Sequence, residues 1–298
     1  MSRLYGAVEA GGTKFNCAVG TGPADLRAQI RIDTDDPEST LEKTCTFFRA
    51  AITQHGPLAT VGVGSFGPID LDRTSPTYGS ITSTPKPGWA NTDIVGFLSQ
   101  SLDLPVAFDT DVNTAALGEA RWGAGVGLHS LLYLTIGTGI GGGAVADGGV
   151  VHGLMHPEMG HIPVPHDRDR DPYEGCCPYH GDCLEGLASG TALRDRWGTA
   201  AHSLPADHEA WPLEATYLGG ALATFILTLS PQRILLGGGV MEQQHLFPRV
   251  RNETARVLQD YLKLPELHED LDAFIAPPGL GSRAGICGAL ALAENAGT

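Results

Sequence analysis

The sequence predicts an α/β protein with two lobes, and three observations indicate this class. The chain has 298 residues, more than one hydrophobic core usually supports. Short apolar strands alternate with segments of helical periodicity, as in α/β folds. The order strand, glycine-rich turn, strand occurs twice, over residues 4–20 and 130–147. We therefore expect two halves that share a plan.

The first half begins with a strand pair and a third strand. A helix follows, because Asp36 is a good N-cap and Pro37 suits the first helical position. The expected elements are strands at Leu4–Glu9, Lys14–Gly20, Leu26–Asp33 and Ala59–Gly64, and helices from Pro37 and over Asp111–Trp122.

The second half repeats the opening and then becomes mainly helical. A loop rich in proline, histidine and cysteine separates its first strands from the helices. The expected elements are strands at Ser130–Ile136, Ala144–Asp147, Arg233–Leu236 and Asp272–Ala276, a short strand near Val150, and helices at Leu184–Trp197, Leu213–Leu229, His245–Leu262 and Arg283–Asn295.

Composition and charge exclude several kinds of partner. The chain is 42% hydrophobic, enough for a sizeable core, and its formal net charge is -15. An acidic surface repels nucleic acids and anionic membranes. The N-terminus lacks the apolar segment of a signal peptide, and no stretch approaches the roughly 18 to 20 apolar residues that span a bilayer. We expect a cytoplasmic protein without nucleic-acid or membrane partners.

Three glycine-rich turns are candidates for phosphate binding, because glycine lets backbone N–H groups approach an anion. The first turn is Glu9–Lys14, the second is Thr135–Gly143, and the third is Gly237–Gly239. Two such turns could hold one polyphosphate, and the third suits a flat adenine or ribose. At the first two turns the strand enters a hairpin rather than a helix, which argues against a Rossmann domain, and no Walker A sequence is present.

The residues Cys177, His180 and Cys183 follow one another at intervals of three, and His161 lies sixteen residues upstream of Cys177. If the four converge, they form the Cys₂His₂ set of a closed structural zinc site. The alternative is a pair of reduced cysteines with surface histidines. Cys176 is a competing ligand. The nearby His152, His156 and His166 are expected to be ordinary polar loop residues.

These motifs, together with Asp109–Asn113, His156–His161 and Cys177–Glu185, resemble those of the ROK sugar kinases, and of bacterial fructokinases in particular. The resemblance runs from about Gly6 to the last helix. It implies an actin-like ATPase (ribonuclease H-like) fold in which ATP and a hexose meet between the lobes. Magnesium accompanies ATP in that chemistry.

The resemblance also implies a role for each matching residue. Asp111 becomes the general base for the sugar hydroxyl, whereas on its own it is more simply interpreted as an N-cap. Glu158, His161 and Glu185 accept sugar hydroxyls, and Glu9 holds magnesium. The residues implied for ATP are Gly11, Gly12, Thr13, Lys14, Thr138, Gly139, Thr191, Gly238, Gly239 and Met241.

The expected division places residues 1–112 in a small lobe and 113–282 in a large lobe. The large lobe carries a zinc loop at 155–185 and an adenosine loop at 237–241. The C-terminal helix, 283–298, is expected to pack back on the small lobe. A homodimer is expected from the resemblance alone.

Other interpretations remain at this point. Within the kinases, glucokinase, manno(fructo)kinase and N-acetylmannosamine kinase are alternatives to fructokinase, although His180 favours fructose because glucokinase-like members usually have cysteine there. ROK repressors bind sugars without catalysis, but they carry a helix-turn-helix ahead of the first turn. Glu9, Thr110 and Thr191 depart from the aspartate, asparagine and proline usual in relatives.

Overall fold

A computed structural model describes residues 3–259 and 261–297, which form two compact units. The first unit comprises the chain up to Gly127, residues 149–157 and the chain from Ser282 on. The second comprises residues 128–148 and 158–281. The first unit thus extends beyond the boundary expected at residue 112, because the helix that begins at Asp111 packs mainly against the C-terminal helix.

The first unit is built on one five-stranded sheet with helices on both faces. The strands are β1 (Leu4–Ala10), β2 (Lys14–Gly22), β3 (Asp25–Asp33), β4 (Leu58–Ser65) and β7 (Val106–Thr110). Their order is β3-β2-β1-β4-β7. Strand β2 is antiparallel to both of its neighbours, β1 and β3, whereas β1, β4 and β7 are parallel.

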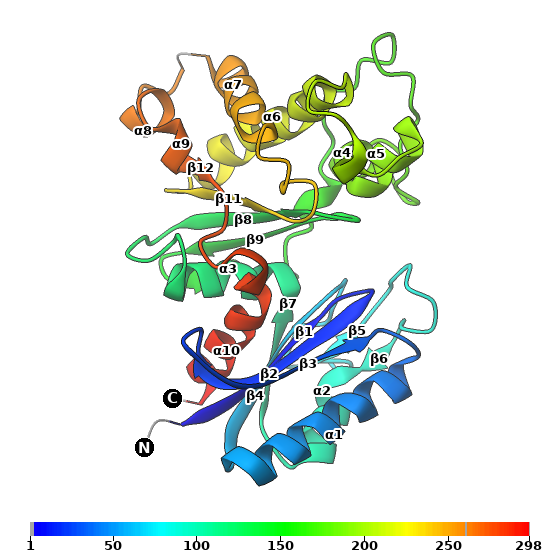
Figure 1. Cartoon of the computed structure of the whole chain (residues 1–298), viewed down its shortest axis with the longest axis vertical. Helices are drawn as coiled ribbons and strands as arrows, with labels where there is room; N and C mark the ends of the chain where they lie inside the picture. The colour runs from blue at the N-terminus through cyan, green and yellow to red at the C-terminus, as the bar shows by residue number, and fades with distance from the viewer. Residues whose placement is uncertain (1–2, 260, 298) are drawn as a thin grey trace. The chain divides into compact units, whose positions relative to one another are not determined.

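Two pairs of helices cover this sheet. Helices α1 (Pro37–His55) and α2 (Ile94–Leu102) contact one face, and α3 (Asp111–Trp122) and α10 (Ala284–Ala296) contact the other (Figure 1). The Asp36 carboxylate accepts a hydrogen bond from the Ser39 N–H at 2.9 Å, which confirms the predicted cap of α1. The short elements α2 and β7 were not predicted from the sequence. Three two-residue strands, β5 (Ser80–Ile81), β6 (Thr92–Asp93) and β10 (Gly149–Val150), complete the unit.

Helices α3 and α10 approach each other very closely. A Cβ atom at Gly288 would overlap the carbonyl of Thr114, and one at Gly118 would approach the Gly288 backbone at 2.7 Å. The close approach therefore requires glycine at both positions. It holds the helix that begins at Asp111 against the C-terminal helix.

The second unit contains four sheet strands, which lie in the order β9-β8-β11-β12, and a group of helices. The strands are β8 (Leu131–Ile136), β9 (Ile140–Ala146), β11 (Ile234–Gly237) and β12 (Ile275–Ala276). The helices are α4 (Leu184–Ala188), α5 (Gly190–Trp197), α6 (Ala210–Leu229), α7 (Leu246–Leu258), α8 (Pro265–His268) and α9 (Leu271–Phe274).

Three predicted elements differ from the structure in the second unit. The helix expected over 184–197 is interrupted at Ser189, whose hydroxyl caps α5 by accepting the Ala192 N–H at 3.1 Å. The helix expected to reach Leu262 ends at Leu258, and residue 260 lies outside the described residues. The strand expected over 272–276 is a helical turn followed by the two residues of β12. Short apolar segments carry too little periodicity to separate these states.

Helix α6 corrects the expectation that no segment approaches membrane-spanning length. Among the described helices it is the one long and apolar enough to cross a bilayer. More than half of that stretch is buried, and α6 packs against α7 and α4. Burial inside the unit therefore accounts for its apolar character.

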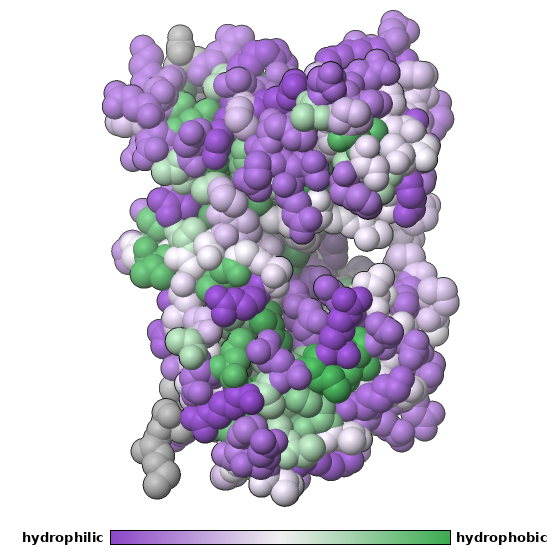
Figure 2. Space-filling view, viewed as in Figure 1, coloured by the Kyte–Doolittle hydropathy of each residue, from purple (hydrophilic) through white to green (hydrophobic). Residues whose placement is uncertain are grey.

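On the face drawn in Figure 2 the surface is largely hydrophilic, with apolar residues in separate groups.

The carboxyl group of Glu214 lies inside the second unit and makes stability depend on pH. Its side chain is 1% exposed, and neither oxygen has a hydrogen-bond partner. Burial raises the pKa of Glu214 well above its ordinary value, although Arg196 partly opposes this. The folded state thus favours the neutral form of Glu214. The contribution of Glu214 to the stability of the fold is complete at pH values below its pKa in the unfolded chain, and it is lost as pH rises through its pKa in the folded protein.

We expect Glu214→Gln to flatten the dependence of Tm on pH. The parent should lose stability relative to the variant as pH rises from the ordinary glutamate pKa through the raised pKa of Glu214, because Gln does not ionise. Thermal melts at several pH values measure the difference. The matched control is Glu209→Gln, an exposed residue just before α6, which should leave the slope unchanged. Equal slopes for the parent and Glu214→Gln would contradict the prediction.

Candidate active site and metal centre

In the first unit, three parallel strands end at the same edge of the sheet. The register pairs Ala10 with Ser65 and Ser65 with Thr110. The Gly11–Lys14 turn, the loop after Ser65 and Asp111 therefore follow neighbouring strand ends. Ligand sites in α/β sheets form at the carboxyl ends of parallel strands, so the sheet brings two predicted segments, the first turn and Asp111, to such an edge.

The first glycine turn is held rigidly. The Gly11 N–H donates to the Lys14 carbonyl at 2.9 Å. Thr34 braces the turn from β3's end, because its N–H donates to the Thr13 carbonyl at 3.1 Å and its hydroxyl to the Gly11 carbonyl at 2.7 Å. At Gly12 a Cβ atom would meet open space. The turn therefore presents an unobstructed backbone at Gly12.

Glu9 lies at the end of β1, and its carboxylate is buried. Burial raises the pKa of Glu9, and the hydrogen bond from Asn16 at 2.8 Å and the charge of Lys14 partly offset this. A buried carboxylate with one amide donor favours a nearby cation. Glu9 therefore fits the chemistry of a magnesium-binding group, and the sequence motif alone gave no indication of its partner Asn16.

The first turn of α3 separates the capping residue from the predicted base. The N-cap is Thr110, whose hydroxyl accepts the Asn113 N–H at 3.1 Å. Asp111 is the first helical residue, and its Oδ1 accepts the Val112 N–H at 2.9 Å. The interpretation of Asp111 as the N-cap is therefore wrong. Its carboxylate lies near the positive end of the helix, where a negative charge is stabilised.

Two histidines expected to be ordinary loop residues occupy specific positions in the first unit. His152 pairs with Asp109, Nε2 to Oδ2, at 2.9 Å. His156 is 3% exposed, and its Nε2 accepts the Ile69 N–H at 3.0 Å. Burial lowers the pKa of His156. The spacing of these residues in the sequence gave no signal of either contact, because both partners are distant along the chain.

In the second unit, the segments predicted to bind nucleotide come together at the ends of β8 and β11. The Gly190 N–H donates to the Gly137 carbonyl at 2.7 Å, and the Thr191 hydroxyl donates to the Thr138 carbonyl at 2.8 Å. The adenosine loop, residues 237–241, joins them. Its Val240 N–H donates to the Ile136 carbonyl at 3.0 Å, and its Met241 N–H donates to the Gly238 carbonyl at 3.1 Å. Segments more than a hundred residues apart thus form one backbone-lined surface.

Glu185 connects this surface to the predicted sugar residues. Its Oε2 accepts the Ile140 N–H at 2.9 Å, beneath the second glycine turn. A Cβ atom at Gly139 would lie only 2.5 Å from the same oxygen. Burial, with the nearby charge of Glu185, raises the pKa of Glu158 to about 7. The two carboxyl groups are therefore close enough to interact.

His161, Cys177, His180 and Cys183 form the predicted metal cluster. Their ligand atoms all lie within 4.8 Å of one another. The Nδ1 of His161 lies 3.7 Å from the Cys177 sulfur and 3.5 Å from the Cys183 sulfur, and the Nδ1 of His180 lies 3.6 Å from the Cys177 sulfur. Tetrahedral zinc with ordinary bond lengths separates sulfur and nitrogen ligands by about 3.5 Å. The donor set and its spacing therefore fit Zn²⁺.

Cys176 lies outside this cluster although it is adjacent to Cys177. Its sulfur is 3.9 Å from the Ser189 hydroxyl. Among the described side chains, the group that could hold a metal does not include Cys176, so the structure does not support Cys176 as a ligand.

A buried network braces the zinc loop against the helices of its unit. Asp171 accepts two hydrogen bonds from Arg196, at 3.1 and 3.0 Å, and one from the Tyr217 hydroxyl at 2.6 Å. His166 contacts the Asp171 carbonyl at 2.9 Å and the Asp182 carboxylate at 3.0 Å. His166 is therefore a buried connector between the helices and the residue preceding Cys183.

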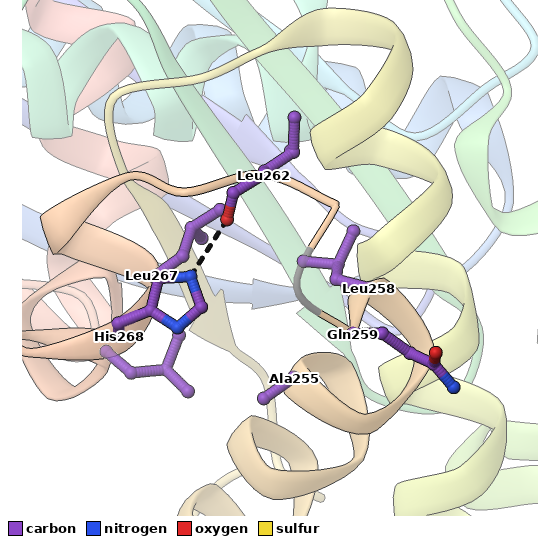
Figure 3. Close-up of a pocket in the computed structure, with 7 residues that line it drawn as sticks. Ala255, Leu258, Gln259, Leu262, Leu267 and His268 are labelled. Carbon is purple, nitrogen blue, oxygen red and sulfur yellow. Dashed lines mark hydrogen bonds between the residues drawn. The ribbon is translucent and has the colours of Figure 1, made fainter.

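A small cavity of about 110 Å³ lies apart from these residues, where α7 meets α8 and α9 (Figure 3). Its walls are mainly leucine side chains, and the His268 ring contacts the Leu262 carbonyl at 2.9 Å. None of the residues predicted to bind nucleotide, sugar or metal lines it. The cavity is therefore separate from the candidate site.

Comparison with known proteins identifies the fold and the family. The solved structure of a ROK hexokinase from Thermus thermophilus matches with a TM-score of 0.80 and 28% identity over 98% of both chains. The fold is that of the actin-like ATPases. The ROK family model matches residues 5–296, and the chain belongs to the ROK family.

Two curated relatives are similar over nearly their full length. The chain is 48% identical to a fructokinase from Zymomonas mobilis over 295 residues, which cover 98% of this chain and 96% of the relative. It is 43% identical to a fructokinase from Streptococcus mutans over 297 residues, which cover 99% of each chain.

Proposed function

We propose that this protein is an ATP-dependent fructokinase, which converts D-fructose and ATP to D-fructose 6-phosphate and ADP. The observation that carries the proposal is the contact of Glu185 with the second glycine turn, because it joins a sugar-binding carboxylate to a phosphate-binding backbone. The similarity to two fructokinases supports fructose as the sugar.

In the proposed reaction, the C6 hydroxyl oxygen of fructose forms a bond to the γ-phosphorus while the bond from that phosphorus to ADP breaks. Asp111 orients the hydroxyl and accepts its proton. Phosphoryl transfer has a loose transition state, so positioning and charge neutralisation contribute most of the acceleration. The two glycine turns supply N–H groups to the phosphates, and the adenosine loop receives the base and ribose.

The sugar-binding residues have complementary roles. Glu158 and Glu185 accept hydrogen bonds from sugar hydroxyls, and each carboxylate can accept more than one. His161 directs Nδ1 toward the metal cluster, which leaves Nε2 for the sugar. A site built from such groups rejects analogues that lack a hydroxyl, because its buried polar atoms would remain unpaired.

Two metals belong to the proposal. Magnesium, when bound with ATP, neutralises charge on the β- and γ-phosphates, and Glu9 is the residue proposed to hold it. His161, Cys177, His180 and Cys183 would hold zinc. A closed Cys₂His₂ set leaves no open position for substrate, so zinc would stabilise the loop that carries the sugar residues.

A coupled assay of ADP release tests the proposed function. With ATP and magnesium, fructose should give a higher kcat/KM than glucose, mannose or N-acetylmannosamine. A higher kcat/KM for another sugar of this panel would identify that sugar, and not fructose, as the substrate. Sugar binding without ADP release would indicate a non-catalytic ROK regulator instead.

We also propose that the protein is a homodimer, as expected from the family resemblance. Light scattering of the same sample measures its mass in solution and tests this.

The contact between Gly139 and Glu185 gives a sharper prediction. Gly139→Ala should lower kcat/KM by roughly 10- to 100-fold, because the new methyl group would displace Glu185 from the Ile140 N–H, and small displacements are costly at reacting centres. The control is Gly220→Ala on α6, where a Cβ atom meets open space. That variant should be active and about 0.5–1 kcal/mol more stable. Equal activity of the two variants would contradict the prediction.

A further inference from the structure

The turn that carries Asp111 is enclosed by a set of hydrogen bonds that converge on Asp109. This carboxylate is 4% exposed. Its Oδ1 accepts the Thr110 N–H at 2.8 Å and the Asn113 side-chain amide at 2.7 Å. Asp109 therefore bridges the end of β7 to the first turn of α3, and the bridge encloses Asp111 and Val112, the two residues between Thr110 and Asn113.

His152 completes this arrangement from another part of the chain. Its Nε2 lies 2.9 Å from the Asp109 Oδ2 and 3.4 Å from the Asn113 amide nitrogen. Asn113 and His152 thus act as two donors to opposite oxygens of one carboxylate, which requires a proton on Nε2. The Asn113 Oδ1 is buried and has no hydrogen-bond partner, so the orientation of this amide depends on Asp109.

The segment that carries His152 is fixed at a second point. His156 accepts the Ile69 N–H, in the loop that follows β4. Residues 149–157 are therefore attached to the ends of both β4 and β7, and the chain continues directly into Glu158. The interaction of Asp109 with His152 connects the turn of the proposed base to the segment that leads to the proposed sugar carboxylate.

We propose that His152 is a positioning residue for Asp111, acting through Asp109 and Asn113. The inference rests on the proposed kinase function. The charged and titratable groups that face His152 are Asp109 from β7 and His156 from its own segment, and Asn113 faces it from α3. The Asp109 hydrogen bond raises the pKa of His152, so the ion pair is complete below the ordinary histidine pKa and is lost as pH rises through the raised value.

Two variants separate the contributions of the donor and of the charge. His152→Ala removes both, and we expect kcat to fall about 10- to 100-fold with KM for ATP changed less than about 2-fold. His152→Gln keeps an N–H donor near the Nε2 position without a titrating charge. Its kcat should stay within about 5-fold of the parent, and it should lack the decline of kcat at alkaline pH that we expect for the parent.

A double variant tests whether Asp109 mediates the effect. Asp109→Asn alone places an amide N–H against the N–H of protonated His152, so it should lower kcat strongly at pH values where His152 is protonated. Adding His152→Gln lets the two amides pair, so the double variant should recover at least about 5-fold over Asp109→Asn. Lys43→Gln is the control, because it removes the exposed ion pair of Lys43 with Asp35, 3.0 Å apart in the same unit. It should leave kcat and its pH profile unchanged.

The outcomes distinguish this inference from the function on which it rests. A parent without ADP release refutes the proposed function itself. An active parent with His152→Ala within about 2-fold of its kcat overturns the positioning role. If His152→Ala lowers Tm and all kinetic constants together, and His152→Gln keeps the parent pH profile, His152 is merely structural and the inference fails.

Discussion

Asp111→Asn should reduce kcat about 10²- to 10⁴-fold, the range typical of general-base catalysis. Asparagine has nearly the same shape but cannot take the proton of the sugar hydroxyl. Folding should be preserved, because Thr110 and not Asp111 caps α3. The affinity for ATP should change little, since the proposed phosphate contacts are backbone groups of other segments. Steady-state kinetics with fructose and equilibrium binding of ATP provide the two measurements.

The control for this substitution is Asp103→Asn, the same chemical change at an exposed residue of the same unit. Asp103 adopts a left-handed conformation at the end of α2, which asparagine also tolerates. This control should keep the activity and Tm of the parent. If Asp111→Asn retains more than half of the parent kcat, Asp111 is not the base.

Cys183→Ser should remove the metal and most of the activity. We expect the purified parent to contain one zinc per chain and the variant to lose it, because a closed site depends on all four ligands. Without the metal, the loop that carries His161 would shift, and a displacement of about 1 Å can lower kcat/KM by roughly 100-fold. Metal analysis, thermal melts and the kinase assay measure the three consequences.

The adjacent Cys176 provides a matched control for the zinc experiment. Cys176→Ser makes the same sulfur-to-oxygen change in the same loop, but its sulfur lies beside Ser189. The variant should keep its zinc, its Tm and its activity. Zinc loss in Cys176→Ser, or zinc retained in Cys183→Ser, would contradict the assignment of ligands.

The sequence was sufficient to predict elements and motifs that depend on neighbouring residues. The cap at Asp36, the glycine turns and the spacing of Cys177, His180 and Cys183 are local patterns with a direct physical cause. The end of β1 also followed from an apolar run that stops at a polar residue, and the helix beginning at Asp111 was predicted although β7 before it was not. These features place Asp111 and the first turn without reference to distant parts of the chain.

Contacts between distant residues could not be predicted in the same way. The pairing of His152 with Asp109 depends on a chain that leaves the first unit and returns, and no periodicity records that return. The boundary expected at residue 112 differs from the observed one for the same reason, since α3 belongs with a helix made of the last residues. Short elements such as α9 and β12 were misassigned because tertiary contacts decide their state.

The packing of α3 against α10 has a consequence for the order of events during synthesis. The ribosome completes the second unit before it makes the residues of α10, and domains generally fold as units while the chain emerges. Until then, α3 exposes the surface around Thr114 and Gly118 against which Gly288 packs. The helix that begins with the proposed base therefore gains its closest neighbour only after the second unit has been made, so the nascent chain should acquire catalytic competence only when α10 emerges from the ribosome.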